Sequence, residues 1–237
     1  MRGLAIFYTA LLACSSFVRA SELGLDPTRF SLAKRASVAL STYKGVATFY
    51  GNDGSGGNCK LPARSDLAFA AFPGAKWDSA AYCGACVRVK GPKGTVDVQI
   101  TNKCPECPAG SLDLSKAAYS KIRAIKAGRI PITWNFINCK TAGLASGAVP
   151  FVWKSGSSQY WAGIQGHNAA IPIKSLSIRA SSATKLTTLK REDFNYFVAP
   201  AGLGPGPFVA VVRYQNGSKS THKGLRLNAV IGDEGGA

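Results

Sequence analysis

Hydrophobic and polar positions alternate in short runs along most of this chain, a pattern typical of β-strands. In the first half the runs predict strands at Gly45–Tyr50, Val87–Val89, Thr95–Ile100 and Ile130–Ile137. One segment, Leu114–Lys126, instead has a helical period and is followed by Gly128 as its expected stop. Its apolar face would carry Ala117, Ala118, Ile122 and Ile125. We expect a mainly β domain with one helix.

The second half shows strand patterns only, broken by Gly, Ser, Asn and Pro. The strands expected here are Phe151–Lys154, Tyr160–Gln165, Ser175–Arg179, Phe194–Val198, Phe208–Tyr214 and Gly224–Leu227. Their spacing is typical of a β-sandwich. Small residues at 141–147 follow the last cysteine, so we place a linker there. The expected domains are 36–140 and 148–228, with a C-terminal tail at 229–237.

The N-terminus has the pattern of a secretory signal peptide. Arg2 precedes the apolar run Leu4–Cys14, and a small-residue cleavage site ends at Ala20. The run is about half of the roughly 20 residues that a membrane-spanning helix needs, so we expect residues 1–20 to be removed. Residues 21–35 end on Lys34 and Arg35 and are either a pro-segment or a disordered N-terminus. We expect a secreted protein without a membrane partner.

The cysteines fit an exported protein. The chain has seven, and six of them, all between residues 59 and 139, remain after Cys14 leaves with the signal peptide. An even number in an oxidising compartment predicts three disulfides. Zinc is the alternative, because Cys83 with Cys86 and Cys104 with Cys107 have the spacing of a zinc site. Six cysteines suit pairs better than tetrads, so we expect no metal and no cofactor.

Charge points to the kind of partner. The formal net charge is +17, and residues 1–35 carry five basic and two acidic groups, so +14 remains without them. Excess positive charge outside the cell favours acidic polymers such as pectin. Nucleic acid is not expected, because Lys and Arg are scattered singly through both halves and the protein is exported.

The first half is short of groups for hydrolysis, which at a glycosidic bond normally takes two carboxyl groups. Both histidines of the chain, His167 and His222, lie in the second half. The carboxyl candidates are Asp53, Asp66, Asp78, Asp97, Glu106 and Asp113. Only Glu106 and Asp113 lie in suggestive surroundings; Asp53 and Asp97 are interpreted as solvated surface residues. Asp113, just before the predicted helix, could also serve as its N-cap.

Short motifs then give a family resemblance. Those in the first half are Ala47–Gly51, Gly56–Cys59, Cys83–Cys86, Val89–Pro92, Ile100–Cys107, Gly110–Ser115 and Ile132–Trp134. Those in the second half are Lys154–Ser158, Tyr160–Ala162 and Asp193–Asn195. Their types and order resemble expansins, particularly microbial expansin-like proteins. The resemblance implies a six-stranded double-psi β-barrel followed by an immunoglobulin-like β-sandwich of the family 63 carbohydrate-binding type.

The resemblance also implies a site in the barrel. Expansins are similar to family 45 endoglucanases but keep only the aspartate that matches the general acid. Asp113 matches that aspartate, and Thr48, Tyr50, Asn102 and Glu106 would line the same substrate groove. Many relatives carry aspartate where this chain has Asn102, which disfavours hydrolysis further. A lone acid could still protonate a glycosidic oxygen, so a lytic transglycosylase or weak endoglucanase using Asp113 is the enzymatic alternative.

In the second domain the resemblance assigns sugar-stacking roles to Tyr160, Trp161 and Phe194, with Lys154 at the rim. The flat apolar faces of cellulose stack on exposed rings. Neighbouring strand residues point to opposite faces, so if one of Tyr160 and Trp161 is in the core we expect it to be Tyr160. Core positions are expected at Trp153 and Tyr196.

The disulfide pairing that the resemblance implies is Cys59–Cys83, Cys86–Cys139 and Cys104–Cys107, among the fifteen that six cysteines allow. Asn216–Ser218 is both a glycosylation sequon and a hairpin-turn signal. The expected function is a monomeric, secreted protein that binds cellulose and other cell-wall polysaccharides and loosens them without hydrolysis. A wall-binding or defence protein of the barwin type is the other alternative.

Overall fold

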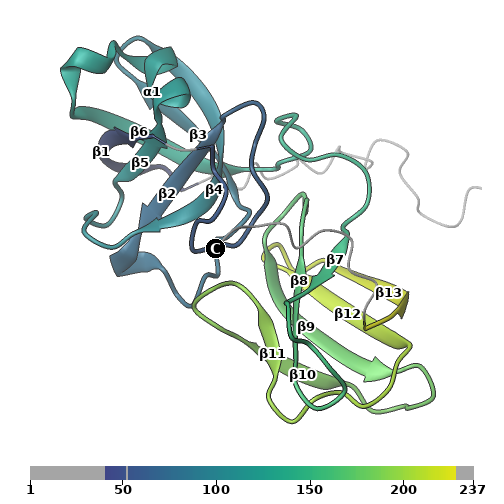
Figure 1. Cartoon of the computed structure of the whole chain (residues 1–237). Coiled ribbons are helices and arrows are strands. Elements are labelled where there is room, and N and C mark those ends of the chain that lie inside the picture. Colours follow the sequence, from purple (N-terminus) through teal and green to yellow (C-terminus); the bar gives the residue numbers. More distant parts are fainter. Residues whose placement is uncertain (1–40, 52, 228–237) are drawn as a thin grey trace, which may run out of the picture. The chain divides into compact units, whose positions relative to one another are not determined.

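The computed structural model describes residues 41–51 and 53–227 (Figure 1). The expected signal peptide, pro-segment and C-terminal tail lie outside these residues. The described part of the chain forms two β domains in succession. None of the helices in this part has the length and apolar character needed to cross a membrane.

The first domain is a closed six-stranded barrel with strand order β1-β5-β2-β4-β3-β6. Its strands are β1 Tyr43–Tyr50, β2 Phe69–Pro73, β3 Cys86–Gly91, β4 Gly94–Cys104, β5 Leu112–Ser115 and β6 Ile130–Ile137. The pairs β1 with β5 and β2 with β4 are parallel, whereas the other neighbours are antiparallel. Parallel pairing needs long connections, so the barrel brings distant parts of the sequence side by side.

The helix is shorter than its sequence pattern predicts. It spans Lys116–Ile122 (α1), and a 3-10 turn follows at Ile125–Ala127 (η3). Ser115 is the N-cap, because its hydroxyl accepts a hydrogen bond from the Ala118 N–H at 3.1 Å. The interpretation of Asp113 as the cap is therefore wrong. Asp113 lies in strand β5, which pairs with β1 and β2 before the helix begins.

Strand β2 is absent from the sequence-based prediction, and its burial explains why. All five of its residues are buried, so it reads as a continuous apolar run without the alternation that marks a half-exposed strand. A second 3-10 turn, Gly74–Lys76 (η2), follows it directly.

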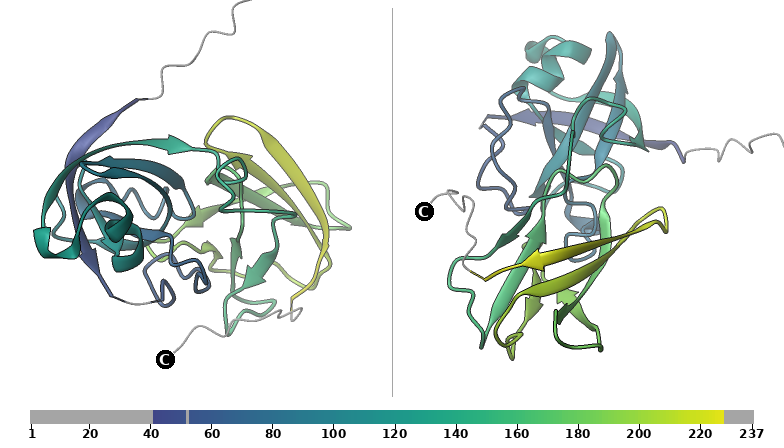
Figure 2. Two further views of the ribbon diagram at one scale, coloured as in Figure 1. Left: turned by 90° about the horizontal axis from the view of Figure 1, so that it is seen from above. Right: turned by 90° about the vertical axis from the view of Figure 1, so that its right-hand side faces the viewer.

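The second domain is a seven-stranded antiparallel sheet in the order β13-β12-β9-β10-β11-β8-β7. Its strands are β7 Phe151–Trp153, β8 Ala162–Gly166, β9 Ile173–Ala180, β10 Thr187–Arg191, β11 Phe197–Ala199, β12 Phe208–Tyr214 and β13 Lys219–Leu225. Strand β10 pairs with β9 on one side and β11 on the other, and the sheet folds over at this strand into two layers (Figure 2). Trp153 of one layer meets Phe208 of the other, with ring centroids 5.6 Å apart.

The mainly β fold class is confirmed, although strand limits shift and β10 had not been expected. The last predicted strand, Gly224–Leu227, begins earlier, at Lys219, because it pairs with β12 across the Asn216–Ser218 turn. Separate apolar clusters fill the two domains. The disulfides are Cys59–Cys83, Cys86–Cys139 and Cys104–Cys107, so the implied pairing is confirmed. They use the four sulfurs, those of Cys83, Cys86, Cys104 and Cys107, that the alternative zinc site would have needed.

Candidate functional site

Three polar residues and one alanine, from four neighbouring strands, lie side by side across the barrel wall. We call this set the polar row. Thr48 of β1 pairs with Asp113 of β5, Asp113 pairs with Ala71 of β2, and Ala71 pairs with Asn102 of β4. The neighbours of Asp113 along β5, Leu112 and Leu114, are fully buried in the core, so strand alternation turns Asp113 away from the barrel interior.

Asp113 is the acidic member of the polar row. Thr48 Oγ1 donates a hydrogen bond to Asp113 Oδ1 at 2.5 Å. Burial raises the pKa of Asp113 above its ordinary value, the Thr48 hydrogen bond opposes this, and the negative charge of Glu106 adds to the rise. The carboxyl group therefore keeps its proton to a higher pH than an exposed aspartate would. A protonated carboxyl group is the form that can donate to a glycosidic oxygen.

Tyr50 lies at the end of β1 and packs against Ala71 and the Cys104–Cys107 disulfide. Its ring also meets Phe69 edge-on, with centroids 5.6 Å apart. Burial raises the pKa of Tyr50 to about 12. The phenol is therefore neutral at physiological pH. Glu106, inside the short ring that the disulfide closes, is exposed.

Asn102, in strand β4, binds the loop that contains Asn58. Its Oδ1 accepts hydrogen bonds from the backbone N–H groups of Asn58 at 2.8 Å and Lys103 at 2.9 Å. The loop can approach this closely because residue 57 is glycine: a Cβ there would lie 2.5 Å from the Thr101 carbonyl oxygen. An aspartate could accept the same two bonds, so the change to asparagine removes a charge and keeps the acceptor.

The sandwich places three aromatic rings close together. A Cβ on Gly163 would lie 3.3 Å from Trp161 Cη2 and 3.6 Å from Tyr196 Cδ1, so both rings come close to this glycine. The Phe194 and Tyr196 ring centroids are 6.1 Å apart. The Lys154 Cβ is also 3.3 Å from the same point, which places this side chain beside Trp161. Gly163 is the residue that sequence reasoning missed, and a glycine inside a strand is the signal that could have found it.

The strand-alternation argument, by which one of Tyr160 and Trp161 would be in the core, does not hold at these two residues. The Tyr160 side chain is 75% exposed, and neither Tyr160 nor Trp161 belongs to the core. Both residues precede β8 in a turn where strand alternation does not apply: the Ser158 N–H bonds the Trp161 carbonyl, and the Tyr160 N–H bonds the Ser158 hydroxyl. Trp153 and Tyr196 are each 3% exposed, as expected for core positions.

A basic face covers the other layer of the sandwich. Strands β9, β12 and β13 carry five Lys or Arg residues and no Asp or Glu. Arg213 pairs with Lys219, while Val209 pairs with Lys223 on one side and Arg179 on the other. We call these four cations the basic face. Val212 and Ile178, at alternate positions, are buried in the core, so the basic face points outward.

One sizeable hollow, about 740 Å³, lies apart from all the predicted site residues. It is lined by Asp66, Ala68, Arg88, Thr95, Val96, Asp97, Lys121 and residues 142–144. Arg88 and Asp97 bind each other through two hydrogen bonds of 2.7 and 2.8 Å. Asp97, predicted to be a solvated surface residue, is thus an ion-paired one.

A closed six-stranded barrel with a partly buried acid on its wall, followed by an antiparallel β-sandwich, defines a class of two-domain β proteins. The double-psi β-barrel family model described as lytic transglycolase matches residues 42–134. Expansin-YoaJ of Bacillus subtilis is 34% identical over 185 residues, which cover 76% of this chain and 77% of the relative.

Solved structures agree with this match. The crystal structure of an expansin from Clavibacter michiganensis has a TM-score of 0.71 at 36% identity, covering 79% of this chain and 92% of that one. An aspartate-to-asparagine mutant of that expansin, in complex with cellohexaose, has the same TM-score at 35% identity and the same coverage. The chain belongs to the expansin family.

Proposed function

We propose that this protein is a secreted expansin that binds cellulose-type polysaccharide and loosens it without hydrolysing it. The observation that carries the proposal is the polar row, in which Asp113 has Thr48 and Ala71 as its neighbours and Asn102 beyond them. Hydrolysis normally takes two carboxyl groups flanking the bond, and this row supplies one. The Clavibacter relative in complex with cellohexaose supports a β-glucan as the ligand.

The two domains would divide the work. Trp161, Phe194 and the exposed Tyr160 would stack on glucose rings, since aromatic side chains bring large contact area at low entropic cost. On the barrel, Thr48, Tyr50 and Asp113 would engage a single chain and separate it from its neighbours. The signal-peptide pattern at residues 1–20 supports export, and neither role needs a cofactor.

The test is a paired assay on one cellulose sample. Soluble reducing sugar and mechanical creep are measured together for the wild type and for Asp113→Asn, with Asp53→Asn as the matched control. Asp53 is an exposed carboxylate bonded to Ser55 and lies outside the polar row. We expect creep without sugar release, lost only in Asp113→Asn. Sugar release that depends on Asp113 would instead make the protein an enzyme.

A lytic activity is the second candidate, favoured by the raised pKa of Asp113 and by the lytic transglycolase model that matches the barrel. An acid that keeps its proton to a higher pH than an exposed aspartate could protonate the leaving oxygen while a hydroxyl of the sugar closes on the anomeric carbon. Such a reaction leaves anhydro-sugar ends, which mass spectrometry separates from hydrolytic ends.

The basic face supports a further partner of the same proposal, an acidic wall polymer such as pectin. Lys219, Arg213 and Lys223 are exposed and have no acidic residue on their own strands. A face of one charge attracts a polyanion, and salt weakens that attraction.

A further inference from the structure

The turn that carries Phe194 is hydrogen-bonded to the barrel through the residues on either side of Phe194 in the sequence. The Asp193 carbonyl oxygen accepts a hydrogen bond from Trp77 Nε1 at 3.0 Å and another from Asn58 Nδ2 at 3.5 Å. Asn195 Nδ2 donates to the Cys59 carbonyl oxygen at 3.0 Å. The residues before and after Phe194 are therefore each bonded to the barrel.

Asn195 also fixes the shape of this turn. Its φ is 66°, in the left-handed region that asparagine tolerates better than most residues. Its N–H donates to the Glu192 carbonyl at 3.0 Å and closes the turn. Its side chain is 8% exposed, and hydrogen bonds shielded from water in this way are stronger than exposed ones.

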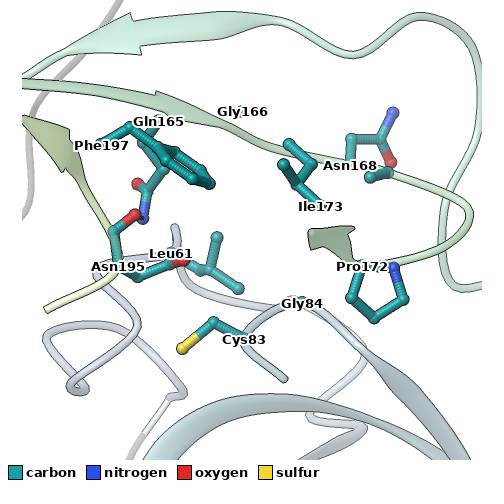
Figure 3. A pocket seen from close by; sticks show the side chains of 11 residues that line it. Leu61, Cys83, Gly84, Gln165, Gly166, Asn168, Pro172, Ile173, Asn195 and Phe197 are labelled. Carbon is teal, nitrogen blue, oxygen red and sulfur yellow. Dashed lines mark hydrogen bonds between the residues drawn. The ribbon is translucent and has the colours of Figure 1, made fainter. Parts of the chain in front are cut away.

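Gln165 of β8 ties the same turn to the same barrel carbonyl. Its Nε2 donates to the Cys59 oxygen at 2.7 Å and to the Asn195 oxygen at 3.2 Å, and its side chain is 1% exposed. Figure 3 shows the amide groups of Gln165 and Asn195 next to each other, beside Leu61 and Cys83. The Cys59 acceptor is itself held in place by the disulfide to Cys83.

Hydrogen bonds also connect this turn to the polar row. Asn102, a member of that row, accepts the Asn58 N–H, and the Asn58 side chain donates to Asp193. Lys103, the next residue of β4, lies 3.2 Å from the Asp193 carboxylate and 5.6 Å from the Trp77 ring centroid. A surface ion pair such as this one contributes little free energy. The hydrogen bonds of the buried amide and indole groups are therefore the main contacts that hold the turn on the barrel.

The junction has no room for a sugar. The cavity between Leu61, Gln165 and Asn195 has a volume of about 20 Å³. Small-molecule sites are usually larger than about 300 Å³. The cluster of polar side chains is therefore a set of fixed contacts and does not form a binding pocket.

We propose that Trp77 and Asn195 are positioning residues that hold the Phe194 ring at a fixed place beside the barrel, so that one polysaccharide chain contacts Phe194 and the polar row together. This inference rests on the proposed function. A ring on a free turn would lose backbone freedom on binding, and a turn already bonded in place avoids that loss. The two residues act through Phe194 and need not touch the sugar.

The test is a double-mutant cycle on binding to insoluble cellulose and to cellohexaose. Asn195→Gly keeps the left-handed backbone and removes the amide, Phe194→Ala removes the ring, and a third variant combines both changes. Asn195→Gly should lower affinity about three- to tenfold in the wild-type background and have no further effect once the ring is gone. Trp77→Phe, which removes the indole donor together with part of a buried ring system, should lower affinity in the same way.

Asn168→Gly is the matched control. Asn168 also has a left-handed φ, 58°, and its side chain bonds backbone carbonyls, those of Ser146 and Ala148. The same substitution there should leave cellulose affinity unchanged. Thermal unfolding of every variant separates a loss of stability from a loss of affinity.

Two results would overturn the positioning role. One is wild-type affinity in both Asn195→Gly and Trp77→Phe, whatever their melting temperatures. The other is a full second loss when Asn195→Gly is added to Phe194→Ala, because Asn195 would then act independently of the ring. Wild-type affinity in Phe194→Ala would remove the ring assignment and this inference with it, whereas a wild type that fails to bind cellulose would refute the proposed function itself.

Discussion

The hydroxyl group of Thr48 donates a hydrogen bond of 2.5 Å to the Asp113 carboxylate. The two residues lie on neighbouring parallel strands, although 65 residues separate them along the chain. This bond favours the charged carboxylate, while burial and the charge of Glu106 favour the neutral form. The protonation of Asp113 is therefore set by opposing effects that single substitutions can separate.

Substitutions on the two sides of Asp113 should move its pKa in opposite directions. Thr48→Val removes a hydrogen bond to the charged form and should raise the pKa of Asp113 further. Glu106→Gln removes a nearby negative charge and should lower it. Carboxyl resonances followed by NMR over a pH series measure both, with Asp97→Asn as a control that should leave Asp113 unchanged. Shifts of the same sign in the two variants would contradict this account.

Asp113→Asn should stabilise the fold relative to the wild type at neutral pH, and this gain should disappear at acid pH. The native state holds the Asp113 proton more tightly than the unfolded state, so this group stabilises the wild type at low pH and loses that effect as pH rises through its folded pKa. The gain at neutral pH should be below about 1 kcal/mol because the site is only half-buried. Thermal unfolding at several pH values checks this, and a variant less stable than the wild type at neutral pH would refute it.

The aromatic residues of the sandwich should divide by exposure. Tyr160→Ala and Trp161→Ala should weaken cellulose binding with little change in the free energy of unfolding, since Tyr160 is 75% exposed and Trp161 is outside the core. Trp153→Ala should cost about 3–5 kcal/mol of stability, because it removes a buried ring. Pull-down isotherms and denaturant titrations measure the two effects. Unaltered binding in both Tyr160→Ala and Trp161→Ala would argue against stacking.

The disulfides should differ in their contribution to stability. Cys86–Cys139 spans 53 residues and Cys104–Cys107 spans three, so replacing the first pair with alanine should cost about 2 kcal/mol more through the entropy of the unfolded chain. Urea unfolding of the two double variants tests this ranking. Equal losses would mean that local packing, not chain entropy, sets the contribution.

The basic face should determine binding to acidic polymers and leave cellulose binding alone. A variant with Lys219, Arg213 and Lys223 changed to glutamine should bind pectin more weakly, and its remaining binding should depend less on salt. Binding to pure cellulose should stay at the wild-type level. Wild-type binding to whole walls that is insensitive to salt would contradict the charge argument.

The sequence predicted the fold where local signals were strong. The motif order gave the six-stranded barrel and the disulfide pairing, and period-two runs gave strands such as β6 and β12. Strand β2 escaped because burial on both sides removes the alternation. The predicted helix start was wrong because Leu114 fits the helical spacing but lies in strand β5, where it pairs with β1.

The contacts around Phe194 were beyond sequence reasoning for a different reason. Trp77, Cys59 and Asn195 lie far apart along the chain and meet only in the folded protein. Tyr160 was assigned from strand alternation, which holds inside a strand and fails in the turn before it. Only the left-handed turn at Asn195 has a local sequence signal, because asparagine adopts a positive φ more readily than most residues.

The Cys86–Cys139 disulfide has a mechanical consequence. Cys139 follows the last barrel strand, β6, and its partner Cys86 opens strand β3, which is paired with β6 at the same level. Tension applied to the chain from the sandwich side would arrive at Cys139 before it reaches β6. The disulfide would then pass the load to β3, so that the pull would not separate β6, the last strand of the barrel in sequence, by breaking its hydrogen bonds one at a time.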